Sequence, residues 1–158
     1  MKRLIECVPN FSEGRDPAKV DAIVAAMSSV PGVHVLDREM DADHNRSVVT
    51  LAGEPDAVAE AALLGTGKAM ELIDLTKHKG AHPRVGATDV LPFIPIDGVS
   101  IEDCVALARR VGNEIWKRYR IPVFFYEAAA TGPLAWTFQL SQDSRVPSGS
   151  VSSARQTT

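Results

Sequence analysis

Residues 77–89, KHKGAHPRVGATD, carry the densest chemistry of this 158-residue chain. Five basic or imidazole side chains fall within eight residues, although the net charge of the chain is −3. Gly80, Pro83 and Gly86 interrupt the run. Because glycine tolerates positive φ and proline lacks a backbone N–H, we expect neither a regular helix nor a central strand here. The stretch predicts a shaped loop with a positive field and two imidazoles that can carry protons near neutral pH.

This loop leads directly into an apolar stretch, LPFIPI, at residues 91–96. Loops that border a strand on a rigid scaffold are where binding and catalytic residues concentrate. A solvated basic turn is the alternative interpretation of the same composition. The position beside a strand favours a functional loop.

The rest of the pattern predicts short strands that alternate with amphipathic helices. Runs rich in Leu, Ile and Val indicate strands, and N-cap residues followed by apolar positions at helical spacing indicate helices. We expect strands at 3–8, 33–36, 47–52, 92–96 and 121–126. We expect helices at 17–30, at 54–74 and from Ser100 onward. The intervening residues 9–14 are expected to form a loop, and 37–44 an acidic, polar link.

The element order is β-α-β-β-α-β followed by α-β, which is the split βαβ order of ferredoxin-like folds. The predicted class is therefore α/β (α+β): a ferredoxin-like core extended by a further α-β unit, with helices layered on one face of a mixed sheet. Pro92 and Pro95 favour an edge or bulged strand, because proline donates no ladder hydrogen bond. Gly65 and Gly67 weaken the second helix unless close packing requires them.

Composition excludes several classes of protein. An acidic chain, with a pI near 5.8, argues against nucleic-acid binding. No apolar run reaches the length of a membrane span, and the first residues do not form a secretory signal. Cys7 and Cys104 lie far apart in sequence and predict reduced, packed thiols. We expect a cytoplasmic protein with one folded domain at 1–130 and a low-complexity, disordered tail at 131–158.

Three stretches then identify a family. ECVPNFSEG at 6–14, DHNRSV at 43–48 and HKGAHPRVGATDVLPFIP at 78–95 follow one another in order. Together they resemble the amino-terminal subdomain of the glutamate formiminotransferase family, which includes the transferase half of formiminotransferase-cyclodeaminase. The resemblance covers about residues 3–130, and three ordered blocks are far more specific than one short motif.

The resemblance implies folate-dependent chemistry in histidine degradation and one-carbon metabolism. Such enzymes move a formimino group between glutamate and N5 of tetrahydrofolate, which is a co-substrate, and they need no metal; a formyl donor stays open. The resemblance places the catalytic histidine at His82. A histidine suits the task because its reference pKa of about 6.5 lets it take and give protons near neutral pH.

Further site residues are expected around this histidine. A carboxylate would fix its tautomer, and of Asp37, Glu39, Asp41 and Asp43 we favour Asp41. The substrates are folate and glutamate, both anions, so cationic side chains are expected to hold their carboxylates. The expected binding residues are Asn10, Ser12, Glu13, Asn45, Arg46, His78, Lys79 and Arg84. Turn chemistry is the alternative role for the first three.

Other family members continue into a linker and a carboxy-terminal subdomain that this sequence is expected to lack. We therefore expect weak or absent turnover by the chain alone, and as partner either a second copy in a homodimer or a separate carboxy-terminal subdomain. A non-catalytic folate- or anion-binding or interaction module is one alternative function. A metal-dependent hydrolase is another, because His78 and His82 have ligand spacing, although Lys79 stands where a zinc-protease glutamate would be.

Overall fold

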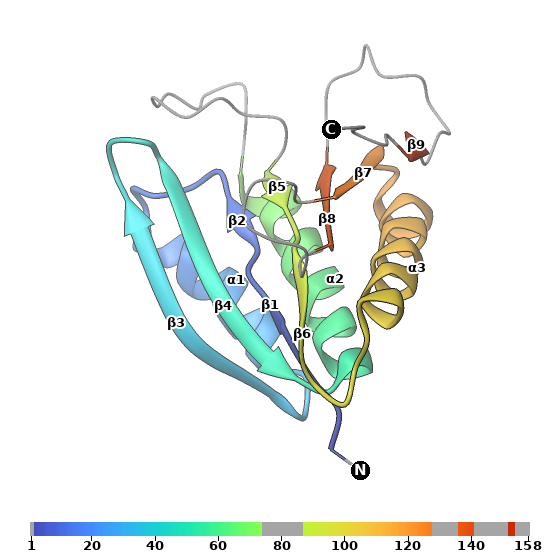
Figure 1. Cartoon of the computed structure of the whole chain (residues 1–158). Helices are drawn as coiled ribbons and strands as arrows, with labels where there is room; N and C mark the ends of the chain where they lie inside the picture. The colour runs from blue at the N-terminus through green and yellow to red at the C-terminus, as the bar shows by residue number, and fades with distance from the viewer. Residues whose placement is uncertain (1, 74–86, 128–135, 141–151, 154–158) are drawn as a thin grey trace.

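The computed structural model describes residues 2–73, 87–127, 136–140 and 152–153 (Figure 1). Within these ranges the helices are α1 (Pro17–Ser28), α2 (Pro55–Leu72) and α3 (Ile101–Tyr119). The first strands are β1 (Leu4–Cys7), β2 (Asn10–Phe11), β3 (Val33–Asp41), β4 (Arg46–Gly53) and β5 (Thr88–Val90). The later ones are β6 (Phe93–Asp97), β7 (Val123–Glu127), β8 (Trp136–Leu140) and β9 (Ser152–Ser153).

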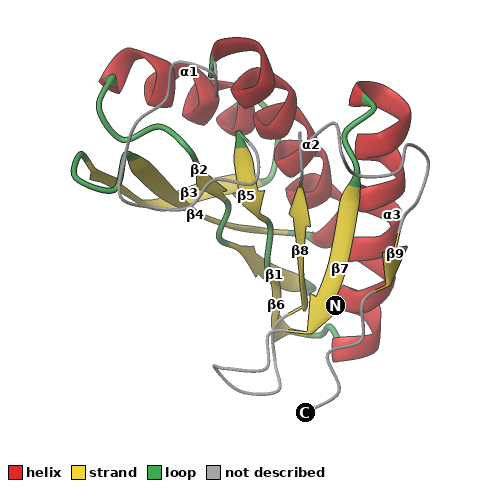
Figure 2. Ribbon diagram, turned by 90° about the horizontal axis from the view of Figure 1, so that it is seen from above, coloured by secondary structure: helices red, strands yellow, loops and turns green. Residues whose placement is uncertain are grey.

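One curled sheet carries these helices. Its strands follow the order β5-β2-β4-β1-β6-β8-β7-β9, with β3 paired to the outer side of β4 and a further pairing between β5 and β8. The pairings are antiparallel except that of β7 with β9. Figure 2 shows α1 and α2 next to each other on one side of the strands, at the top of the view, and α3 beside β7. The described residues thus form an α+β fold with one face of the β3-β4-β1 sheet open.

Local signals predicted the helices well. The Asp16 side chain accepts a hydrogen bond from the Ala18 amide (3.0 Å), and Pro17 follows as the first helical residue. At α3, Ser100 and Asp103 form the expected capping box, with side-chain to backbone distances of 3.0 Å in both directions. The α+β class is observed, whereas the ferredoxin-like arrangement stays a prediction.

Of two expectations about the strands, one was wrong and one was confirmed. Residues 37–41 are not a link but the second half of β3, whose acidic side chains belong to the exposed side of an edge strand. For the strand with Pro95, the bulged alternative is confirmed and the edge alternative is not, because β6 pairs with β1 on one side and, at Phe93, with β8 on the other. The ladder tolerates the proline because the register shifts beside its partner Ile5.

Four described strands were missed. The strands β2, β5 and β9 have two or three residues, too short to show a period. The strand β8 lies in the stretch from 131 onward, where we expected a tail, and it pairs with β5, β6 and β7. The division of the chain at residue 130 stays a prediction.

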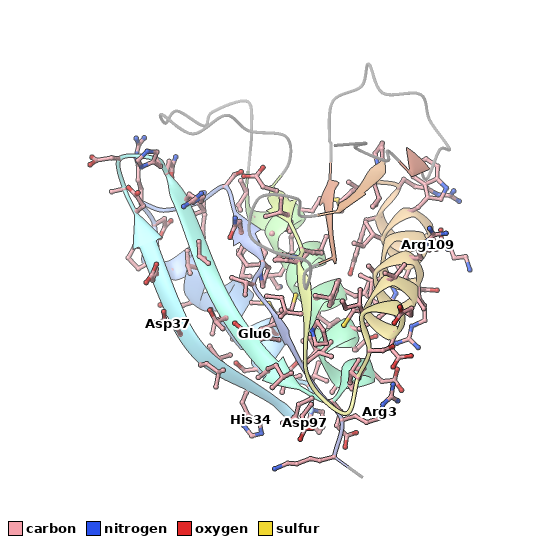
Figure 3. The ribbon with its side chains drawn as sticks, viewed as in Figure 1. Arg3, Glu6, His34, Asp37, Asp97 and Arg109 are labelled. Carbon is pink, nitrogen blue, oxygen red and sulfur yellow. The ribbon has the colours of Figure 1, made fainter. Side chains whose placement is uncertain are left out.

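Alternation along β4 separates a core face from an open face. Ser47, Val49, Leu51 and Gly53 are buried beneath the helices, whereas the residues between them are partly exposed. Figure 3 shows Glu6 and Asp37 on the open face, which is turned toward the viewer. Because the described helices pack on the other face, charged side chains can stand on this one without desolvation.

Candidate functional site

The three sequence stretches meet at one end of the sheet. The short strand β2 lies between β4 and β5, where Asn10 is paired with Val48 on one side and Val90 on the other. The stretch 6–14 therefore touches both 43–48 and the end of 78–95. Chain segments separated by more than thirty residues are brought together by these pairings.

The loop after β2 is locked onto the turn between β3 and β4. The Gly14 amide donates to Asn45 Oδ1 (2.8 Å), and Arg15 Nε donates to the Ala42 carbonyl (2.9 Å). A Cβ atom on Gly14 would collide with the backbone of Asp41 and Arg46, so only glycine permits this approach. Asn45 adopts a left-handed φ of 51° and is 5% exposed. Loop and turn thus form one rigid unit.

A second junction ties the same loop to the start of β5. Ser12 Oγ donates to Asp89 Oδ2 (3.2 Å), and the Ser12 amide donates to the Ala87 carbonyl (2.9 Å). Both side chains are buried, and buried carboxylates persist where hydrogen bonds satisfy them. Asp89 is not among the site residues predicted from the sequence. An acidic residue at the end of a basic loop was the available signal.

Glu13 also faces inward, next to the start of α1. Its Oε2 accepts hydrogen bonds from the amides of Arg15 (3.1 Å) and Asp16 (3.3 Å), and Oε1 lies 3.6 Å from Lys19 Nζ. These contacts hold the entrance of α1. A role for Glu13 in binding substrate stays a prediction.

Asp41 holds the turn between β3 and β4 and binds an imidazole. Its Oδ1 accepts from the amides of Asp43 (3.0 Å) and His44 (3.1 Å), and its Oδ2 lies 2.7 Å from His44 Nδ1. The backbone hydrogen bond from His44, followed by the His44 side chain, lowers the pKa of Asp41. Since the carboxylate is ionised, His44 Nδ1 carries the proton. Asp41 was predicted from the sequence to be the partner of a histidine, but His44 was not predicted to be that histidine.

A hollow lies beside this turn on the open face. Its cavity volume is about 520 Å³, and it is lined by Glu39, Met40, Asp41, Ala42, Arg46 and Val48. Asn10 is paired with Val48, so the predicted residues Asn10, Asp41 and Arg46 border one region. The other predicted residues His78, Lys79, His82 and Arg84 lie outside the described residues.

The described residues offer few other chemical groups. In these ranges no cluster of three or more His, Cys, Asp or Glu side chains could hold a metal ion. No helix among them has the length and apolar character needed to cross a membrane. Cys7 and Cys104 are free and buried; burial raises the pKa of both thiols, that of Cys104 to about 11. Such thiols are poor nucleophiles.

Comparison with known proteins decides the family. Residues 4–141 match the family model "Formiminotransferase domain, N-terminal subdomain". This chain belongs to that family. The match to the formiminotransferase family model extends beyond residue 130, where the resemblance noted in the sequence ends, and includes β8.

Its relatives are formimidoyltransferases. Over 133 residues the chain is 48% identical to the glutamate formimidoyltransferase of Streptococcus pyogenes serotype M1, covering 84% of this chain and 44% of that protein. It is 47% identical to the formimidoyltransferase-cyclodeaminase of Mus musculus, over 84% of this chain and 25% of that protein. It is 48% identical to the glutamate formimidoyltransferase of Thermoplasma acidophilum, over 82% of this chain and 43% of that protein. The chain thus spans less than half the length of these relatives.

Proposed function

We propose that this formiminotransferase subdomain acts in the folate-dependent transfer of a formimino group between glutamate and tetrahydrofolate. The observation that supports this is the meeting of the three family stretches at one end of the sheet, through the junctions of Gly14 with Asn45 and of Ser12 with Asp89. Transfer of a formyl group in place of the formimino group, by the same residues, is the alternative form of this reaction.

The transfer requires two proton movements. The attacking N5 of tetrahydrofolate loses its proton as it bonds to the one-carbon centre, and the glutamate nitrogen gains a proton as its bond to that carbon breaks. His82 is the proposed general acid/base for both steps. It precedes Ala87 by five residues in the sequence, and the Ala87 carbonyl is fixed by the Ser12 amide.

The carboxylates of both substrates need cationic partners. Arg46 on the open face is the proposed anchor within the described residues, and Lys79 and Arg84 are proposed beside His82. Asn10, Ser12, Glu13, Asn45 and His78 are proposed to shape the same pocket. Asp41 remains the proposed orienting carboxylate, and it would act while still hydrogen-bonded to His44.

The matched transferases are more than twice as long as the part that they share with this chain. Because the chain covers 44% of the S. pyogenes transferase, we propose that a second subdomain completes the folate pocket. Turnover by the chain alone is accordingly expected to be weak.

Equilibrium binding followed by a transfer assay tests this function. Calorimetry with 5-formyltetrahydrofolate, with and without L-glutamate, should give saturable binding. His82→Ala should lower transfer by about 10²- to 10⁴-fold, the range for loss of a general acid/base. His34→Ala, an exposed histidine at the far end of β3, is the matched control and should leave transfer unchanged. Full transfer by the His82 variant would refute the proposal.

A non-catalytic folate- or anion-binding module is the second candidate. The coverage of less than half of each transferase favours it, since a subdomain can keep a binding surface without a complete reaction centre. Saturable folate binding together with no transfer, even in the presence of a carboxy-terminal subdomain, would support this second function.

A further inference from the structure

The hollow on the open face lies on two paired strands rather than on loops alone. Cross-strand pairing sets Glu39 opposite Val48 and Asp41 opposite Arg46, so all four side chains stand on the same face. The cavity volume of about 520 Å³ falls in the range typical of small-molecule sites. The upper end of the β3-β4 hairpin, where the hollow lies, can be followed in Figure 1.

Two opposite charges line this hollow without neutralising each other. Among the described residues, neither the Glu39 carboxylate nor the Arg46 guanidinium has a side-chain hydrogen bond or ion pair. They are diagonal neighbours across the two strands, a separation of roughly 7–8 Å for such pairs. Asp41 differs, because its oxygens already accept hydrogen bonds from the turn.

The hollow is also rigidly supported. Its turn is fixed by the Asp41–His44 contact and by the hydrogen bonds from Gly14 to Asn45 and from Arg15 to Ala42. Strand pairing holds the backbone of Glu39 and Arg46 in place. A site held in advance loses little conformational freedom when a ligand binds.

A carboxylate and a guanidinium that face one hollow are complementary to a zwitterion. The carboxylate suits a planar, delocalised cation with two parallel N–H donors, and the guanidinium suits a carboxylate in the same two-point geometry. Val48, paired opposite Glu39, supplies an apolar surface for a short methylene chain. An amidine is protonated at neutral pH and offers this pair of N–H groups.

We propose that this hollow binds the formimino donor, with its amidinium on Glu39 and a glutamate carboxylate on Arg46. The inference rests on the proposed transferase function and assigns the amino-acid half of the reaction to the β3-β4 hairpin. Asp41 adds a second negative charge beside Glu39, so the hollow favours a cationic nitrogen group over a neutral amide of the same shape. Glu39 thereby distinguishes the donor from other glutamate derivatives.

Two ligands of nearly equal size test this assignment. The purified chain is titrated with N-formimino-L-glutamate and with N-acetyl-L-glutamate, whose neutral amide replaces the amidinium, and backbone amide NMR shifts are followed. The formimino compound is expected to bind about tenfold more tightly, because a charge-assisted pair is worth more than a neutral contact. Its shifts should centre on β3 and β4.

Matched variants show whether Glu39 carries the preference. Glu39→Gln should lower the affinity for the formimino compound about tenfold and leave the affinity for N-acetyl-L-glutamate unchanged. Asp37→Asn makes the same change of charge on the same strand and face, but Asp37 does not line the hollow, so this control should keep the preference. Arg46→Gln should lower the affinity for both ligands, since both present carboxylates.

Three results would overturn the inference: equal affinity for the two ligands, equal effects of the Glu39 and Asp37 variants, or no saturable binding. These failures are distinct from failure of the proposed function. Folate binding and His82-dependent transfer with no effect of Glu39→Gln would remove this donor site and leave the transferase. Donor binding that depends on Glu39, with no transfer even in the presence of a carboxy-terminal subdomain, would keep the site and remove the transferase.

Discussion

At the scale of single residues, spacing in the sequence indicated chemistry but not contacts. His82 was marked by its basic loop and by the family resemblance, and Asp41 by its acidic stretch. Neither signal could reveal that Asp41 pairs with His44, because that contact depends on a tight turn and on the left-handed Asn45. The buried pair of Ser12 and Asp89 joins residues 77 positions apart and has no local signature.

The lowered pKa of Asp41 gives a pH-dependent prediction. Its folded pKa lies below the ordinary value of 3.8, so its stabilising effect is complete above that value and is lost as pH falls through the folded pKa. Urea unfolding of Asp41→Asn should therefore differ from wild type at pH 7 and converge with it in acid.

Asp43→Asn controls for the loss of one negative charge in the same turn. Asp43 contributes its amide to Asp41, and its replacement should leave the acid dependence as in wild type. A constant difference between Asp41→Asn and wild type at every pH would show that the carboxylate makes no pH-dependent contribution.

At the scale of elements, the helices were predictable because their start signals are local. Asp16, Pro17 and the Ser100–Asp103 box each act within four residues. The second half of β3 was not predictable from composition, because Asp37, Glu39 and Asp41 look like a link. The alternation along β3 can be interpreted only within the sheet, where pairing with β4 sets the register and α1 packs on the other face.

The glycines of α2 provide the element-scale prediction. Replacing an interior helix glycine by alanine normally stabilises a helix by about 1 kcal/mol. Here a Cβ on Gly67 would collide with the Tyr119 ring, whose hydroxyl donates to the Leu63 carbonyl (2.9 Å). We expect Gly67→Ala to destabilise the chain by about 1–3 kcal/mol, as overpacking does.

Gly65→Ala is the matched comparison on the same helix. Its Cβ would lie 2.6 Å from Met27 Sδ, the flexible part of a side chain that can move aside. Thermal or urea unfolding should thus rank Gly67→Ala below Gly65→Ala in stability. The opposite order, or stabilisation by Gly67→Ala, would contradict this account of α2 and α3 packing.

At the scale of the whole molecule, the described helices cover one face of the sheet and leave the other face open. The helices bury one side, while the open side carries Glu6, Asp37 and their neighbours (Figure 3). Family membership followed from three sequence blocks, because each keeps a long local pattern. The strand pairings that join these blocks depend on β2 and β5, which are too short to be predicted from the sequence.

The exposed apolar side chains predict self-association of the chain. Ile96 on β6 is 51% exposed and Leu36 on β3 is 61% exposed. Ile94, on the same strand as Ile96, stands on the open face opposite Glu6, so an apolar strip runs along β6. Light scattering over a dilution series should show the average mass rising with concentration, and Ile96→Lys should shift the chain toward monomer.

Leu36→Lys is the control, because Leu36 lies at the register shift of β3 among charged residues. Bulges and charges on an edge strand oppose pairing between chains, so this change should leave the mass unchanged. If both variants lower the mass equally, association involves the β3 edge rather than β6. A monomer at every concentration would show that the apolar strip along β6 is too weak a contact to hold two copies together.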